Sequence, residues 1–206
     1  MKRFFDIAVS ASALIVLAPL LLVLAMLVKM TSRGPVVFRQ IRVGRNFQPF
    51  EILKFRSMVV DANMQGPQIT AATDKRITKV GKLLRKTKLD ELPQLLNVLK
   101  GQMSFVGPRP EVPRYVAMFR DEYEQILQVR PGITDLATLT FRHESELLAT
   151  AVDPEQAYCD SILPAKIKLS QEYIRRQSFL LDLSILFCTL RSLVSSATPL
   201  ERSAAS

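Results

Sequence analysis

Residues 7–28 form a run of 22 residues without a charged side chain, and no other part of the 206-residue chain has one as long. As a straight helix the run would be about 33 Å long, enough to cross a hydrocarbon core of about 30 Å. Asp6 in the preceding segment, and the lack of a small-residue cleavage site before Lys29, argue against a secretory signal. The run therefore predicts a segment that stays in a membrane.

Basic residues flank this run on both sides. They are Lys2, Arg3, Lys29 and Arg33. The positive-inside rule favours the cytoplasmic side for both flanks, which a straight span cannot satisfy. Pro19, at the middle of the run, interrupts helical hydrogen bonding, and a helix broken there can return to the same face. Ser10 and Ser12 are the nearest partners for the freed backbone groups. The residues alone leave a straight span and a re-entrant helix open.

The basic character of the chain is concentrated in one segment. Residues 29–88 hold 14 Lys and Arg against three acids, whereas the whole chain has a net charge of +9. Such a segment favours an anionic partner, which is nucleic acid, anionic lipid or a phosphorylated substrate, unless it is simply a solvated face. A single histidine, His143, and two cysteines without a CxxC pattern exclude a multi-histidine metal site and a zinc ribbon.

Hydrophobic patterning predicts an α+β fold that is mostly helical. Alternating residues indicate a short β-hairpin from strands at 36–43 and 50–55. Helical periodicity predicts helices at 77–89, 93–99, 112–129, 154–159, 165–176 and 179–194. The first of these is basic and amphipathic, which is typical of helices at a membrane interface. No nucleic-acid module accompanies it, so we expect no nucleic acid as a partner.

These elements divide the chain into three parts. We expect an N-terminal membrane helix at 1–33, a catalytic domain at 34–194 and a disordered tail at 195–206. Within the domain, the polar and irregular residues 62–74 are expected to form a mobile loop.

Two adjacent acids, Asp90 and Glu91, precede Pro93. Helix capping by Asp90 explains this pattern by itself. A helix start also offers free N–H groups and a positive dipole end, which keep a carboxylate ionised and hold a phosphate beside it. Asp90 could then act as a nucleophile toward phosphorus, while Glu91 helps to hold Mg²⁺.

Cations that could face such a site occur in two further motifs. Prolines on both sides of Arg109 restrict its backbone, which suits bidentate phosphate binding, although an ordinary surface loop explains it too. Lys54 and Arg56 share one face of the second strand and would add charge. Arg130 and His143 give no clear indication of a role.

Taken in order, these segments resemble the bacterial sugar transferase family, the small monotopic phosphoglycosyl transferases. The resemblance covers nearly the whole chain. It rests on Lys2-Arg3-Phe4-Phe5-Asp6, Lys54-Phe55-Arg56-Ser57-Met58, Leu89-Asp90-Glu91-Leu92-Pro93-Gln94, Met103-Ser104-Phe105-Val106-Gly107-Pro108-Arg109-Pro110 and Arg130-Pro131-Gly132-Ile133-Thr134.

The resemblance implies a reaction and a set of roles. The enzyme would transfer a sugar-1-phosphate from a UDP-sugar to polyprenol (undecaprenyl) phosphate and release UMP, with Mg²⁺ as cofactor. Asp90 would carry the covalent phosphosugar, with Glu91 beside it, while Lys54, Arg85 and Arg109 contact phosphate.

The resemblance also implies a setting for the enzyme. The N-terminal helix would be re-entrant, broken at Pro19, in the bacterial inner membrane, with the active site on its cytoplasmic face. The reaction would initiate exopolysaccharide, lipopolysaccharide or another surface glycoconjugate. With no soluble domain before Met1, the chain is similar to the minimal catalytic form.

Three positions depart from the family pattern. Ala18 stands where a serine is frequent, Asp135 stands where a glycine is familiar, and Ser170 stands where some relatives have an acid. The residues also leave two rival functions open. One is a non-enzymatic membrane-anchored protein that binds anionic lipid or nucleic acid, and the other is a phosphohydrolase acting on lipid diphosphates.

Overall fold

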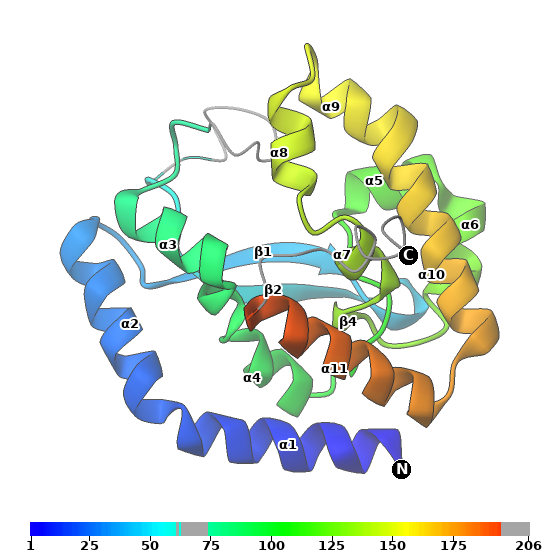
Figure 1. Ribbon diagram of the computed structural model, residues 1–206, viewed down its shortest axis with the longest axis horizontal. Coiled ribbons are helices and arrows are strands. Elements are labelled where there is room, and N and C mark those ends of the chain that lie inside the picture. Colours follow the sequence, from blue (N-terminus) through cyan, green and yellow to red (C-terminus); the bar gives the residue numbers. More distant parts are fainter. Residues whose placement is uncertain (61, 63–73, 195–206) are drawn as a thin grey trace, which may run out of the picture.

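Helices surround two small two-stranded sheets in the structure, a computed structural model that describes residues 1–60, 62 and 74–194 (Figure 1). The prediction of a mostly helical α+β fold is confirmed. Apart from residues 62 and 74 themselves, the predicted loop at 62–74 lies outside the described residues, as does the predicted tail at 195–206. The division into a membrane segment and a catalytic domain stays a prediction.

Two helices, α1 (Lys2–Val16) and α2 (Ala18–Thr31), make up the apolar N-terminal run and are bent by 64° relative to each other. The bend lies at Leu17, and Pro19 lies in the first turn of α2. A proline has no N–H to donate within a helix, so it is tolerated in the first turn of a new helix. Among the described residues no single helix is long and apolar enough to cross a membrane, whereas this bent pair passes that test together.

The surface of the helix pair is largely apolar. Ser10 does not serve the bend, because its hydroxyl donates to Ile7 O at 3.2 Å, within α1. Exposed apolar side chains on the two helices include Phe4, Ile15, Val16, Leu22, Val23, Met26 and Met30. An apolar surface of this kind favours contact with lipid or with another protein. Lipid contact stays the prediction for this pair.

The predicted hairpin is confirmed. Strands β1 (Val37–Val43) and β2 (Pro49–Phe55) pair antiparallel along all seven residues of each. The turn between them holds Asn46 and Phe47 at φ values of 55° and 59°, a region that favours glycine. The guanidinium of Arg120 lies 4.6 Å from the centroid of the Phe47 ring, and this cation–π contact helps to hold the turn.

Helix α3 (Lys79–Thr87) is the predicted basic amphipathic helix, and other parts of the protein cover only part of its apolar side. Leu84 packs with Phe55 of β2 and with Leu24 and Val28 of α2. The exposed lysines of α3 are Lys79, Lys82 and Lys86. Packing against α2 and β2 therefore accounts for only part of the hydrophobic period, because Leu83 is 59% exposed, and a position at a membrane interface stays a prediction.

One predicted helix is split. The helix expected over 112–129 consists of α5 (Pro113–Met118) and α6 (Arg120–Ile126), with Phe119 between them at φ −127° and ψ 44°. Phe119 packs against the main hydrophobic core at this point. Tertiary packing of one aromatic side chain thus overrides the local helical preference.

Two helices predicted as separate are continuous instead. Helix α9 (Pro154–Ala157) passes through a π-helical turn (Tyr158–Ile162) into α10 (Leu163–Arg176). Pro164 lies in the first turn of α10 and cannot donate a backbone hydrogen bond. The π turn just before it keeps the chain helical where the sequence suggested a gap.

Strands β3 (Ser104–Val106) and β4 (Gly132–Thr134) form a parallel pair that the sequence analysis did not predict. Glycine permits this close approach, since a Cβ at Gly132 would lie only 2.2 Å from the backbone nitrogen of Gly107. Further helices pack around this pair and against the core. They are α7 (Leu136–Thr140), α8 (Glu144–Ala149) and α11 (Phe179–Val194). The segments that follow β3 and β4 meet in the candidate site.

Candidate active site

Asp90 and Glu91 lie in a single 3-10 turn, Leu89–Glu91, between α3 and α4 (Gln94–Leu99). The residue before α4 is Pro93, and no side chain caps that helix. The prediction that Asp90 acts as a helix cap is therefore wrong, because the 3-10 turn separates it from the start of α4. Capping does not account for the acidic pair.

Glu91 is the centre of a buried ion-pair cluster. Its side chain is 11% exposed, and Lys54 Nζ donates to its Oε1 at 2.8 Å. Both terminal nitrogens of Arg109 also donate to the Glu91 carboxylate, one of them to Oε2 at 3.4 Å. Burial opposes ionisation of Glu91, but the charges of Arg109 and Lys54 outweigh it and hold its pKa well below the usual range. Glu91 is therefore an ionised, fully engaged carboxylate.

Asp90 has the opposite environment. Its side chain is buried, yet Oδ1 has no hydrogen-bond partner among the described residues. Burial raises the pKa of Asp90 despite the opposing charge of Lys54. A buried carboxylate oxygen without a partner is rare in proteins and costs stability. The two adjacent acids thus differ: both carboxylate oxygens of Glu91 are engaged in ion pairs, whereas Asp90 Oδ1 is available to contact a ligand.

Arg109 is held in place through its backbone and its side chain. The Arg109 N–H donates to Asp135 Oδ2 at 3.1 Å, and its guanidinium donates to Ile133 O at 3.3 Å. Arg42 donates to the carbonyl of Pro110 at 3.2 Å. The charge of Glu91 raises the pKa of Arg109 above its ordinary value. The proline-flanked arginine is therefore a fixed cation at the site and not a loose surface residue.

Asp135 is a residue of this site whose role the sequence analysis missed. It is 1% exposed, and its second oxygen accepts from Thr138 N at 2.6 Å, which caps α7. The sequence does contain an indication, because an aspartate directly before a helical stretch is typical of a cap. Asp135 thus fixes the Arg109 backbone from the start of α7, at the position where the family pattern differs.

The remaining predicted cations separate into two groups. Arg85 Nε donates to Ser57 Oγ at 2.8 Å, and the charges of Asp90 and Glu91 act on it, although burial lowers its pKa. Burial likewise lowers the pKa of Lys54, while Glu91 opposes that effect. Arg56 does not join them: it donates to Ser32 and Pro35 after α2. The expectation that Lys54 and Arg56 both add charge to the site is wrong for Arg56, because Arg56 lies beyond the end of β2.

Arg130 and His143 contact other parts of the protein. Arg130 Nε donates to Gly101 O at 2.8 Å, which ties the segment before β4 to the end of α4. His143 Nδ1 lies 3.2 Å from Glu146 on an exposed surface. The structure gives neither residue a place beside Glu91.

The acidic pair is compatible with Mg²⁺ but not with a metal cage made of protein alone. Within the described part of the chain, no group of three or more His, Cys, Asp or Glu residues could hold a metal ion. Mg²⁺ usually binds one or two carboxylates together with water and substrate phosphates. The unpartnered oxygen of Asp90 suits that arrangement, and Glu91 would contribute by sharing an oxygen with its cations.

The site is thus a buried acidic pair framed by the three cations Lys54, Arg85 and Arg109, on a domain joined to an apolar helix pair. The chain belongs to the bacterial sugar transferase family, whose sequence model matches residues 1–196. The family resemblance of its motifs is thereby confirmed.

Three relatives illustrate the similarity. The chain is 43% identical over 197 residues to UDP-glucose:undecaprenyl-phosphate glucose-1-phosphate transferase of Klebsiella pneumoniae, covering 92% of this chain and 39% of the relative. It is 39% identical over 199 residues to UDP-N-acetylgalactosamine-undecaprenyl-phosphate N-acetylgalactosaminephosphotransferase of Aeromonas hydrophila. This match covers 94% of this chain and 44% of the relative. It is 42% identical over 199 residues to exopolysaccharide production protein PSS of Rhizobium leguminosarum bv. phaseoli. This match covers 93% of this chain and 94% of the relative. The chain thus spans about two fifths of the first two relatives and nearly all of the third.

Proposed function

We propose that this chain transfers a sugar-1-phosphate from a UDP-sugar to polyprenol (undecaprenyl) phosphate and releases UMP, through a covalent intermediate on Asp90. The observation that carries this proposal is the buried Asp90 oxygen without a partner, next to a Glu91 whose ion pairs hold three segments together. The names of the relatives support the donor and acceptor classes. Family membership favours this enzyme over a non-enzymatic binding protein.

The first step uses the difference between the two acids. An oxygen of the Asp90 carboxylate forms a bond to the sugar-bearing β-phosphorus, the bond to the bridging oxygen breaks, and UMP leaves with that oxygen. A carboxylate without hydrogen bonds to its attacking oxygen is a better nucleophile than one engaged in ion pairs. Lys54 and Arg85 favour the ionised form of Asp90, and Arg109 supplies a fixed fork for phosphate oxygens.

The second step restores the enzyme. An oxygen of the lipid phosphate attacks the phosphorus of the phosphosugar, and the bond from phosphorus to the Asp90 oxygen breaks. The product is polyprenyl diphosphosugar, and Asp90 returns to its carboxylate form. Mg²⁺, bound by Asp90, Glu91 and the substrate phosphates, would supply charge neutralisation during these transfers.

A donor-only reaction tests the two-step mechanism. With UDP-glucose or UDP-N-acetylgalactosamine and no lipid acceptor, we expect UMP up to one equivalent per enzyme and a mass increase of one sugar phosphate. The label should map to the peptide containing Asp90 and should disappear when polyprenol phosphate is added. If UMP appears only after the lipid is added, transfer is direct and Asp90 is not the nucleophile. Release of free phosphate from added polyprenyl diphosphate, without any sugar transfer, would instead favour the phosphohydrolase.

We also propose that α1 and α2 form a re-entrant pair whose ends both face the cytoplasm of the bacterial inner membrane. The bend of 64° and the basic residues on both flanks support this topology. Phe4 and Arg33 are exposed, so cysteines there can be labelled without disturbing the core. In intact cells lacking Cys159 and Cys188, we expect both Phe4→Cys and Arg33→Cys to resist an impermeant thiol reagent until the membrane is opened. Labelling of Phe4→Cys from the periplasm would establish a straight span.

A further inference from the structure

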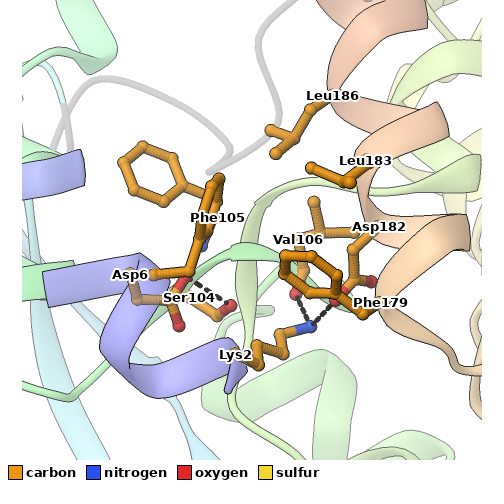
Figure 2. Close-up of a pocket in the computed structure, with 10 residues that line it drawn as sticks. Lys2, Asp6, Ser104, Phe105, Val106, Phe179, Asp182, Leu183 and Leu186 are labelled. Atoms are coloured by element: carbon orange, nitrogen blue, oxygen red, sulfur yellow. Dashed lines mark hydrogen bonds and ion pairs between the residues drawn. The ribbon is translucent and has the colours of Figure 1, made fainter. Parts of the chain in front are cut away.

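Three charged side chains near the start of α1 contact the body of the protein instead of facing outward. Lys2 Nζ donates to Val106 O at 2.8 Å and lies 2.7 Å from Asp182 Oδ2 (Figure 2). It also donates to Tyr173 Oη at 2.8 Å. Tyr173 in turn donates to Asp182 Oδ1 at 2.6 Å. Lys2 therefore connects α1 to the last residue of β3 and to α10 and α11.

Asp6 holds the same strand from the other end. Its side chain is 2% exposed, and Oδ1 accepts hydrogen bonds from Ser104 Oγ and from the backbone N–H of Phe105, both at 3.2 Å. Figure 2 shows Asp6 beside Ser104 and Phe105, at the wall of a small pocket between α1, β3 and α11. Beyond β3 the chain continues through Gly107 and Pro108 to Arg109. Lys2 and Asp6 together therefore fix all three residues of the strand that leads to the phosphate-binding arginine.

Arg3 contacts α4, the helix that follows the Asp90–Glu91 turn. Its guanidinium donates to Val98 O at 2.7 Å and to Leu99 O at 3.0 Å, in the last turn of α4. Carbonyls at the end of a helix lack partners within it, and a cation there is favourable. Figure 1 shows α1 alongside α4. One end of α1 therefore contacts both the strand that leads to Arg109 and the helix that follows the acidic pair.

The positive-inside rule alone does not explain this arrangement. It accounts for Lys2 and Arg3, but Asp6 would contribute little to topology. Asp6 is buried against β3 and accepts two hydrogen bonds there. Its role is therefore to attach α1 to the domain.

We propose that Lys2, Arg3 and Asp6 are positioning residues, which hold the Arg109 segment and the Asp90–Glu91 turn in register, so that the site is complete only when α1 is docked. This inference rests on the proposed function for its kinetic readout. The membrane helix pair is then part of the catalytic framework and not only an anchor.

Asp6→Ala tests the proposal, with Lys29→Ala as the matched control. Lys29 is a charged flank residue whose ammonium lies near Gly34 O, at 3.5 Å, away from both catalytic segments. We expect Asp6→Ala to lower kcat/KM for the UDP-sugar about 10- to 100-fold, as small misplacements of catalytic groups do. Lys29→Ala should stay near the wild-type value, and Phe4→Cys labelling should be unchanged in both. Asp6→Asn, which keeps an oxygen acceptor for Phe105 N–H, should recover part of the loss.

A double-mutant cycle separates positioning from general damage. If Asp6 acts through the Arg109 segment, Asp6→Ala should lower kcat/KM much less in the Arg109→Lys background than in the wild-type protein. Equal losses in both backgrounds, or loss accompanied by altered labelling of Phe4→Cys, would overturn the proposal.

Amide hydrogen exchange provides a readout that needs no substrate. Asp6→Ala should speed exchange across residues 104–109, while exchange in α10 should match that of wild-type protein and of Lys29→Ala. Unchanged exchange across 104–109 would overturn the positioning role even if activity fell. If exchange changes as expected but wild-type protein gives no UMP, the proposed function fails and the structural coupling stands.

Discussion

Asp90→Asn is expected to abolish UMP release from a UDP-sugar while leaving the folded protein at least as stable as wild type. Asn is nearly the same size but has no anionic oxygen to attack phosphorus. Loss of the nucleophile should lower turnover by at least about 10³-fold, which corresponds to about 4 kcal/mol.

The expected effect on stability follows from the environment of Asp90. Its Oδ1 is buried without a partner among the described residues, and burial raises its pKa. An ionised group in that situation lowers the stability of the folded state. Replacing it with a neutral amide removes this cost, so chemistry is lost without loss of fold.

Glu91→Gln is the matched comparison, because it makes the same chemical change one residue away. Here the carboxylate balances Lys54 and Arg109 in a buried cluster, and its loss leaves two cations without their main partner. Breaking a buried ion pair costs about 3–5 kcal/mol, and we expect about 3 because Asp90 remains nearby.

Thermal unfolding of both variants in EDTA, beside UMP release, measures these differences. We expect Asp90→Asn to unfold at or above the wild-type temperature and Glu91→Gln to unfold clearly below it. Near-normal turnover of Asp90→Asn would remove Asp90 from the nucleophile role. Equal destabilisation by the two changes would contradict the asymmetry between them.

Local patterns in the sequence were sufficient to predict the hairpin, most helices and the residues of the acidic pair. Alternation of residue types predicted both strands, although burial itself alternates only in β2, where Phe50 and Ile52 are buried next to the exposed Pro49 and Glu51, while Val43 is the one buried residue of β1. The pair β3 and β4 could not be predicted in this way. Each strand has three residues, and their parallel pairing depends on Gly107 and Gly132 meeting across 25 residues of chain.

The identities of the site residues could be predicted from the sequence, but the different contacts that each of them makes could not. Motif and resemblance indicated Asp90, Glu91, Lys54, Arg85 and Arg109, and the structure brings them together. That Glu91 is consumed by ion pairs while Asp90 keeps a free oxygen depends on side-chain geometry in three dimensions. The contacts of Asp135 and Arg56 also depend on the three-dimensional fold. Asp135 binds the backbone of Arg109, 26 residues away, and Arg56 binds the carbonyls of Pro35 and Ser32, 21 and 24 residues away.

Arg109→Lys is expected to lower kcat/KM for the UDP-sugar about 100-fold, although the positive charge is kept. The guanidinium contacts both oxygens of Glu91 and Ile133 O at once, from a backbone fixed by Asp135. A lysine ammonium cannot reproduce two parallel N–H donors to a carboxylate or a phosphate. Removing one such electrostatic donor typically costs about 10²- to 10³-fold in rate.

Arg39→Lys is the control for this substitution, because Arg39 has a 65% exposed side chain and pairs at 3.3 Å with Glu51, which is also exposed. An exposed ion pair contributes little, so activity and unfolding temperature should stay near those of wild type. For Arg109→Lys the unfolding temperature should also change little, since Glu91 keeps two cations nearby. The loss should therefore appear in donor kinetics and in the rate of the UMP burst, not in folding. Retention of wild-type kinetics by Arg109→Lys would reduce Arg109 to a structural partner of Glu91 and leave Lys54 and Arg85 to bind the diphosphate.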